Sequence, residues 1–340
     1  MKILNKIINI CAYIVVVMIV LVLIDFFIFN KLLNLGNHRC KQHSLDEYIL
    51  VEYPYVGFID KKIAKTEPYS MYYTGNKMCE NADNKIKIAL FGGSTLSYND
   101  AENKNSLNIP QYIEKILNDK LNKGVVVYNY SCGGANHRQH LHMLLEFLSD
   151  INPDIVVFYG GNNETVQYNA TDPRPGYPFN YFYKAECPTW KKFLMEYSAV
   201  FSYVIGNRYI DGKINDIRAK IGWKSDEYKQ KIVENYIDTI EQANKIAGLY
   251  KSEVFGQTKF ISIFQPINQN LGYDVDSDVI NEIRNRIKNI DFAYDYYQKY
   301  DELPQDIWYD NCHVNDEANQ LMANEIAELL IDKYLKEYKK

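Results

Sequence analysis

The chain opens with a long apolar run. From Ile7 to Phe29 the only strongly polar residues are Asn9 and Asp25, near the two ends of the run. A helix of about 20 apolar residues crosses a hydrocarbon core of ~30 Å, so the run has the length of one membrane span. A helix in a soluble core would show a polar side, and this run has none. We therefore predict a transmembrane anchor at residues 1–30.

The flanks of the run favour an anchor over a removable signal peptide. Lys2 and Lys6 precede it, but no small-residue cleavage site follows, and residues 26–29 prolong the apolar stretch. Basic groups on the two sides are balanced, so charge alone leaves the orientation open. Those after the run are Lys31, Arg39 and Lys41.

Beyond residue 85, short apolar runs alternate with helical periodicity. The predicted strands are Ile86–Phe91, Val125–Tyr130, Ile155–Tyr159 and Lys259–Phe264. The predicted helices are Ser106–Leu121, Arg138–Leu148, about 275–299 and about 315–338. Such alternation implies right-handed crossovers and a parallel sheet with helices on both faces. The predicted fold class is therefore α/β.

The rest of the chain falls outside this alternation. Residues 31–85 carry aromatic and turn signals, and we interpret them as a stalk and a small cap on the main domain. A Tyr-, Pro- and Asn-rich loop begins at about 166, and helical segments continue to about 250, which is long for a connection. We expect residues 86–340 to form one domain with an insertion at about 166–250.

Composition narrows the class of protein. Of 340 residues, 47% are hydrophobic, which excludes disorder, and a net charge of −5 argues against a dedicated nucleic-acid binder. The 30 tyrosines can indicate carbohydrate contact, although biased composition explains them better. The cysteines are too widely spaced for a C-x-x-C motif, and a disulfide between Cys132 and Cys312 is one open possibility.

Four polar segments stand where ligands bind in open α/β sheets. Three follow predicted strands directly and the fourth precedes the last helix. They are Gly92-Gly93-Ser94-Thr95, Asn129-Tyr130-Ser131-Cys132-Gly133-Gly134, Gly160-Gly161-Asn162-Asn163 and Asp310-Asn311-Cys312-His313.

Together these segments carry the parts of a serine hydrolase. Ser94 is the candidate nucleophile, His313 the base that takes its proton, and Asp310 the carboxylate that holds the imidazole. The N–H groups of Ser94 and Gly134 and the side-chain amide of Asn162 are the candidate oxyanion donors.

The order and position of these four segments resemble the four blocks of the SGNH (GDSL-type) hydrolases. In one-letter code the segments read FGGST, NYSCGG, GGNN and DNCH. The resemblance covers about residues 86–165 and 258–335. It implies a flavodoxin-like three-layer α/β/α sandwich. It also implies the same roles for the residues: nucleophile, oxyanion donors, base and supporting carboxylate.

The sequence departs from the family pattern twice. The usual Gly-Asp-Ser reads Gly92-Gly93-Ser94, and the usual Gly-x-Asn-Asp ends in Asn163. Neither change removes a group that makes or breaks bonds, so we expect altered hydrogen bonding behind the loops. Leu96 replaces the second glycine of G-x-S-x-G, which disfavours an α/β-hydrolase elbow.

His137, His140 and His142 suggest a metal site at first sight. Their spacing puts at most two on one helical face, and no carboxylate or cysteine stands at ligand spacing. We interpret them as part of a solvated helix, and predict no metal and no organic cofactor.

The sequence therefore predicts a membrane-anchored serine esterase or O-acyltransferase. The resemblance implies the substrate, because anchored members of the family are often associated with surface polysaccharides: an acylated glycan of the cell envelope, O-acetyl favoured, or a small ester. We expect a single-pass protein of the cytoplasmic membrane with its catalytic domain outside, and no nucleic-acid partner. Polysaccharide-acylation machinery is a further candidate partner. Aromatic residues in 166–190 are candidates for substrate contact. The alternative is a non-catalytic envelope assembly or glycan-binding protein on the same fold.

Overall fold

The chain forms two compact units in the computed structural model. One combines residues 1–46 with 180–220, and the other combines 47–179 with 221–340. The residues described are 2–32, 50–53, 55–60, 82–97, 106–166, 172–179, 181–182, 186–271 and 276–340.

The larger unit is built on a parallel sheet of five strands. The strands are β3 (Ile86–Gly92), β4 (Val125–Asn129), β5 (Ile155–Gly160), β6 (Lys259–Phe264) and β7 (Ala293–Asp295). Their order is β4-β3-β5-β6-β7, the flavodoxin-like order 2-1-3-4-5. The register pairs Leu90 with Asn129 and Gly92 with Tyr159, so three strands end at the same edge. The expected α/β fold with a parallel sheet is confirmed.

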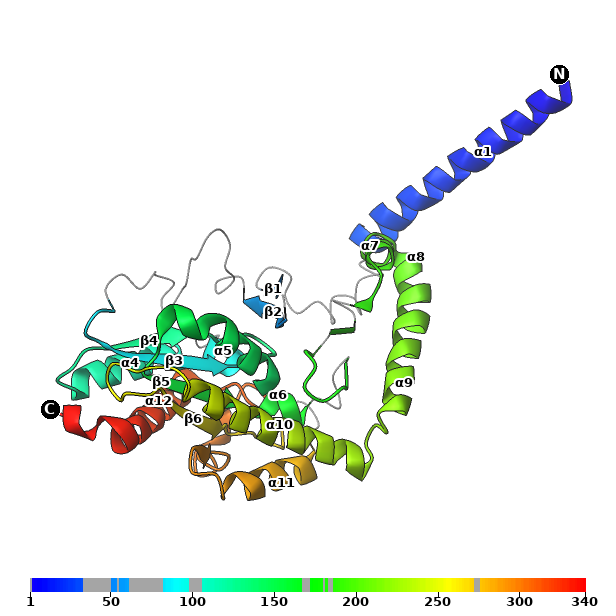
Figure 1. The fold of residues 1–340 in the computed structure, drawn as a ribbon. Helices are drawn as coiled ribbons and strands as arrows, with labels where there is room; N and C mark the ends of the chain where they lie inside the picture. Colours follow the sequence, from blue (N-terminus) through cyan, green and yellow to red (C-terminus); the bar gives the residue numbers. More distant parts are fainter. Residues whose placement is uncertain are drawn as a thin grey trace. The chain divides into compact units, whose positions relative to one another are not determined.

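Helices cover both faces of this sheet, so the unit has three layers (Figure 1). One face carries α5 (His137–Ile151), α10 (Asp226–Ala247) and α11 (Ser277–Ile287), and the other carries α4 (Ile109–Lys120) and α12 (Asp316–Leu330). The shorter helices of this unit are α3 (Ser94–Ser97), α6 (Asn162–Thr165), η5 (Gln305–Ile307), η6 (Ile331–Leu335) and η7 (Lys336–Tyr338).

Capping explains where two of these helices begin. Asn108 accepts from the backbone N–H of Gln111 at the start of α4, and the Gln111 side chain accepts from the Asn108 N–H. Asn136 and Gln139 repeat the arrangement at the start of α5. Each such cap stabilises its helix by about 1 kcal/mol. The cap of α5 also fixes the chain just after Gly134.

One predicted helix is shorter than expected. The pattern over 275–299 predicted a single helix, but α11 ends at Ile287 and residues 293–295 form β7. This strand pairs with β6 at the edge of the sheet through only three residues, all of them partly exposed. So short an edge strand leaves no alternating apolar pattern for sequence reasoning to detect.

The expected insertion at 166–250 contains a helix of the main layers. Helix α10 buries Tyr228, Tyr236 and Ile240 in the core shared with α5, so it belongs to the α/β unit. The inserted segment that forms a separate unit is 180–220. The division at residues 30 and 85 stays a prediction.

Part of the expected cap is a hairpin on the α/β unit. Strands β1 (Leu50–Tyr53) and β2 (Gly57–Asp60) pair antiparallel. The buried Gln139 side chain donates to the carbonyl of Val56 (3.2 Å), which ties the hairpin to α5. Residues 33–49 and 61–81 lie outside the described part of the chain.

The smaller unit contains the N-terminal helix and the inserted segment. Its elements are α1 (Lys2–Ile24), the π-helices η1 (Asp25–Leu32) and η4 (Ser202–Ile210), α7 (Thr189–Tyr197), α8 (Ala199–Phe201) and α9 (Asp211–Lys220). Residues Asn5–Phe29 form an apolar helix with a mean hydropathy of 3.2 and none of it buried. Its length and composition suit a membrane span, a property that anchors share with signal sequences.

Candidate active site

Ser94 lies at the turn between β3 and α3. The strand ends at Gly92 and the helix begins at Ser94, so the backbone N–H of Ser94 is at a helix start, where it has no intrahelical acceptor. A Cβ on Gly92 would lie 2.5 Å from Leu96 Cδ1 and 2.8 Å from the Tyr159 carbonyl oxygen. Glycine is therefore needed at this point for the chain to turn and present the serine.

Two hydrogen bonds in series join Ser94, His313 and Asp310. The distance from Ser94 Oγ to His313 Nε2 is 2.7 Å, and that from His313 Nδ1 to Asp310 Oδ2 is also 2.7 Å. An ionised carboxylate only accepts, so Nδ1 carries the proton and Nε2 accepts from the serine hydroxyl. This is the tautomer that a general base needs. The structure thus brings together three residues that the sequence placed in two distant segments.

The carboxylate of Asp310 is held in its ionised form. Burial alone would raise its pKa, but hydrogen bonds from the His313 ring and from the backbone N–H groups of Cys312 and His313 lower the pKa to about 2. Those N–H groups donate to Oδ1 at 2.9 and 2.8 Å. One carboxylate oxygen therefore fixes the loop while the other fixes the imidazole.

Cys312 adds a buried thiol to this group. Its Sγ, a carboxylate oxygen of Asp310 and a ring nitrogen of His313 lie within 4.8 Å of one another, a spacing that a metal ion can bridge. Burial and the Asp310 charge raise the pKa of the thiol well above its usual value. Asp310 Oδ2 and His313 Nδ1 are already bonded to each other, and His313 Nε2 is bonded to Ser94, so these donor atoms are used within the site. Cys132 and Cys312 do not form a disulfide with each other, so that possibility is not realised.

Asn162 is oriented by a second asparagine. It is the first residue of α6, and its Oδ1 accepts from Asn311 Nδ2 at 2.8 Å. Asn311 is 1% exposed, and its own carbonyl accepts from the Asn268 N–H at 2.8 Å. With the oxygen engaged, the NH₂ group of Asn162 is the side available to an oxyanion. Sequence reasoning did not single out Asn311, since an asparagine inside a DxxH segment carries no signal of its own.

Gly134 occupies the turn before α5. Its φ of 71° is in the left-handed region that favours glycine. Within the described part of the chain, no hydrogen bond uses its N–H. Together with Ser94 and Asn162, it offers a third donor at the edge where β3, β4 and β5 end.

The two departures from the family pattern lie against each other. A Cβ on Gly93 would lie 2.8 Å from Asn163 Nδ2. That amide donates to the carbonyl of Ala135 at 2.7 Å, which an ionised aspartate at the position could not do. The missing side chain at Gly93 leaves room for Asn163, and Asn163 ties the Asn162 turn to the Gly134 turn.

We expect Gly93→Ala to act through Asn163. The added methyl displaces the Asn163 amide, which costs its hydrogen bond to Ala135, about 1 kcal/mol of stability, and about tenfold in kcat. In an Asn163→Ala background the same change should cost little, because the amide is already gone. Thermal unfolding and esterase kinetics of the two single variants and the double variant measure this coupling. Additive effects would contradict it.

We expect Asn311→Ala to weaken the candidate oxyanion site without removing it. Loss of its amide lets the Asn162 side chain rotate, so kcat should fall about tenfold, against about 10²–10³-fold for Asn162→Ala. In the double variant Asn311 has nothing left to orient, so the loss should equal that of Asn162→Ala alone. Steady-state kinetics on p-nitrophenyl acetate test this, and a double variant that loses the product of both factors argues against the positioning role.

The expected solvated helix around His137 is wrong. His137 and His140 are both 0% exposed, because this side of α5 packs under α10 and the sheet. His137 donates from its backbone N–H to Glu164 Oε1, and its Nδ1 lies 2.8 Å from the same oxygen. Burial, with the nearby His137, lowers the pKa of His140 to about 3, so this ring is neutral. The pair His137–Glu164 is a second link between the turns that carry Gly134 and Asn162, the two oxyanion turns of the candidate site.

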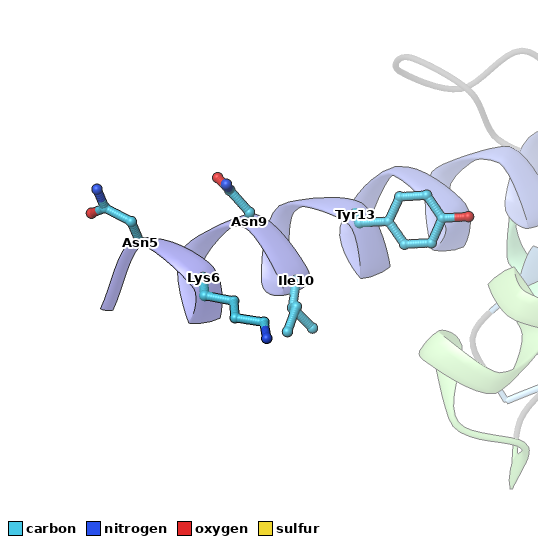
Figure 2. A pocket seen from close by; sticks show the side chains of 5 residues that line it. All are labelled: Asn5, Lys6, Asn9, Ile10 and Tyr13. Carbon is cyan, nitrogen blue, oxygen red and sulfur yellow. The ribbon is translucent and has the colours of Figure 1, made fainter. Parts of the chain in front are cut away.

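Figure 2 shows a separate hollow on the N-terminal helix. Its lining residues are Asn5, Lys6, Asn9, Ile10 and Tyr13, which all come from one exposed stretch of α1. None of the candidate catalytic residues contributes to it. A groove along a single helix brings no groups together for catalysis.

The chain is similar in structure to several ester-cleaving proteins. One is a lipase/acylhydrolase from Enterococcus faecalis, at 13% identity and a TM-score of 0.44 over 73% of this chain and 96% of that one. A second is the lipase Lip_vut3 from a goat rumen metagenome, at 13% identity and a TM-score of 0.45 over 74% and 98%. A third is the acetyl xylan esterase AlAXEase, at 14% identity and a TM-score of 0.37 over 72% of this chain and 100% of that one.

Comparisons of the sequence itself gave no match, either with models of known protein families or with curated proteins. The chemistry of the site therefore rests on the residues of this chain.

Proposed function

We propose that this protein is a serine hydrolase that cleaves O-acyl esters, as the spacing of its motifs predicts. The observation that supports the proposal most is the pair of 2.7 Å hydrogen bonds in series, from Ser94 to His313 and from His313 to Asp310. A serine at a strand end needs no such partners for stability, whereas a nucleophile needs both a base and a group that orients the base.

The geometry suits a two-step acyl transfer. Ser94 Oγ attacks the acyl carbon while His313 Nε2 takes its proton, and the oxyanion receives hydrogen bonds from Ser94 N–H, Gly134 N–H and Asn162 Nδ2. The intermediate collapses by expelling the alcohol, which takes the proton from His313. Water, or the hydroxyl of an acceptor sugar, then attacks the acyl-serine with His313 as base, and Ser94 is released with its proton restored.

We also propose a place for this chemistry. The apolar helix Asn5–Phe29 anchors the protein in the cytoplasmic membrane, with the hydrolase on the extracytoplasmic side. The substrate is then an O-acyl group, O-acetyl favoured, on a cell-envelope glycan. The resemblance to SGNH hydrolases supports this assignment, because anchored members are often associated with surface polysaccharides.

A Tyr-containing segment beside the oxyanion turns supports the glycan substrate. Residues 172–179 are tied to the cap of α5, since Asn136 Nδ2 donates to the carbonyl of Tyr177 at 2.8 Å. The Tyr177 side chain is 39% exposed, and the Arg174 guanidinium lies 4.0 Å from its ring centroid. Asn136 lies two residues after the candidate oxyanion donor Gly134, so the exposed ring is close to the site and suits contact with a sugar face.

Covalent labelling and acetate release test the proposal on the full-length protein in detergent. A fluorophosphonate probe should modify one serine, and peptide mapping should place the label on Ser94. Acetate should be released from an O-acetylated glycan, and an added acceptor sugar should become acetylated if transfer competes with water. Labelling elsewhere would sink the nucleophile assignment. Tight glycan binding with no acetate release, unchanged in His313→Ala, would favour the non-catalytic alternative.

A further inference from the structure

The inserted segment carries an exposed apolar stripe. On α7, Trp190 and Phe193 are each 59% exposed and Tyr197 is 42% exposed. Their spacing of three and four residues puts them on one side of the helix. The stripe continues into the next turns with Val200, Phe201 and Tyr203, which are 54%, 40% and 72% exposed.

The stripe is not the side on which α7 packs within its own unit. Its Met195 is 1% exposed and belongs to a small buried cluster with Phe182, Cys187, Ile210 and Ile214. Helix α7 is therefore apolar on two sides, of which one is used for folding. A helix that folds by one face and exposes Trp, Phe and Tyr on another is built to meet a second apolar phase.

The same segment lies beside the end of the N-terminal helix, and Figure 1 shows α7 and α8 next to the end of α1. Asp25 accepts a hydrogen bond from the Ser198 hydroxyl and another, at 3.1 Å, from the Val200 N–H at the start of α8. The rings of Phe26 and Tyr197 stack with centroids 6.0 Å apart. These contacts place the Tyr197 end of the stripe beside Asp25, at the same height along the axis of the N-terminal helix.

The length of the apolar helix indicates where Asp25 would lie in a bilayer. A helix rises about 1.5 Å per residue, so from Lys6 to Asp25 it extends roughly 29 Å, close to the ~30 Å thickness of a hydrocarbon core. With Lys6 at one boundary of the bilayer, Asp25 is at the other. Tyr197, stacked on Phe26, then lies where headgroups meet acyl chains.

We propose that α7 and α8 lie in the membrane interface, with the stripe Trp190–Phe193–Tyr197–Val200 facing the lipid. This inference rests on the proposed anchor. Trp and Tyr are the residues that favour this zone. The bilayer is favoured over a second protein, because the stripe is attached to the one element of the described chain that is suited to lipid.

Tryptophan fluorescence can test this at a single residue. The chain has three tryptophans, so Trp223→Phe with Trp308→Phe leaves Trp190 as the only one. In vesicles whose phosphatidylcholine carries bromine near the headgroup end of the acyl chain, Trp190 emission should fall by about half or more, and bromine near the chain end should quench it less. The matched control keeps Trp308 alone; this ring packs on Tyr300 inside the α/β unit and should change little.

Two fluorescence results and two extraction results are distinguishable. Trp190 that is quenched by aqueous iodide and not by bromolipid overturns the proposal, because the stripe then faces water. Trp190 protected from both quenchers also overturns it, and shows that protein covers the stripe. Alkaline carbonate extraction reports on the anchor separately. If the protein stays in the membrane but bromolipid does not quench Trp190, the anchor is supported and the interfacial placement of α7 and α8 is overturned. If carbonate releases the protein while bromolipid still quenches Trp190, the proposed anchor is overturned instead.

Discussion

Ser94→Ala is expected to lower kcat/KM for p-nitrophenyl acetate by at least about 10⁴-fold, and to abolish labelling by a fluorophosphonate probe. The alanine removes the atom that lies 2.7 Å from His313 Nε2, so no acyl-enzyme can form. Removal of the nucleophile from a serine triad has effects of this size, while the oxyanion donors alone leave a small residual rate. Kinetics and labelling of the full-length protein in detergent measure both.

Ser97→Ala is the matched control. Ser97 lies on the same short helix, and its hydroxyl donates to the carbonyl of Gly93 at 3.3 Å, so its loss changes the same element without touching His313. We expect an effect of less than about tenfold, as for one peripheral hydrogen bond. If Ser94→Ala retained a tenth of the native rate, or Ser97→Ala lost as much as Ser94→Ala, Ser94 would not be the nucleophile.

Asp310→Asn is expected to lower kcat by about 10⁴-fold while leaving the fold intact. Two backbone N–H groups, of Cys312 and His313, point at Oδ1, so the asparagine must keep its oxygen there and turn its NH₂ toward the ring of His313. His313 Nδ1 then has to accept, which moves the ring proton to Nε2. A protonated Nε2 cannot take the proton of Ser94, and the wrong tautomer accounts for a loss of this size.

An amide also changes the charge that the site keeps at neutral pH. Because the pKa of Asp310 is lowered to about 2, the native carboxylate is ionised throughout an ordinary assay range and stabilises the imidazolium formed during attack. Asp306→Asn serves as control, since this carboxylate is exposed on η5 and should have almost no effect. Activity within about tenfold of native in Asp310→Asn would show that His313 acts without this partner.

Much of the fold follows from local pattern. Apolar runs of five or six residues ended by glycine predicted β3 and β5, and helical periodicity predicted α4 and α12, because burial imposes period and length on the sequence itself. Element ends shifted by a few residues. Strand β7 was missed because its three residues are set by pairing with β6 rather than by burial.

The candidate catalytic residues were also predictable, though their contacts were not. Residue type and position after a strand singled out Ser94, Gly134 and Asn162, and the DxxH spacing singled out Asp310 and His313. The hydrogen bond from Ser94 to His313 joins residues 219 positions apart, and no local pattern encodes a distance of that kind.

By itself, then, the sequence determined the parallel sheet with helices on both faces, four of its five strands and the residue types at their ends, because these depend on neighbours along the chain. The order of the strands in the sheet came from the structure. The tertiary structure decided which side chains support the site. Asn311 reaches Asn162 across 149 positions, and the space left at Gly93 admits Asn163. Burial turned His137 from an expected surface residue into a core one. Such contacts depend on packing between segments distant in sequence, where one missing Cβ or one buried amide decides which partners can meet.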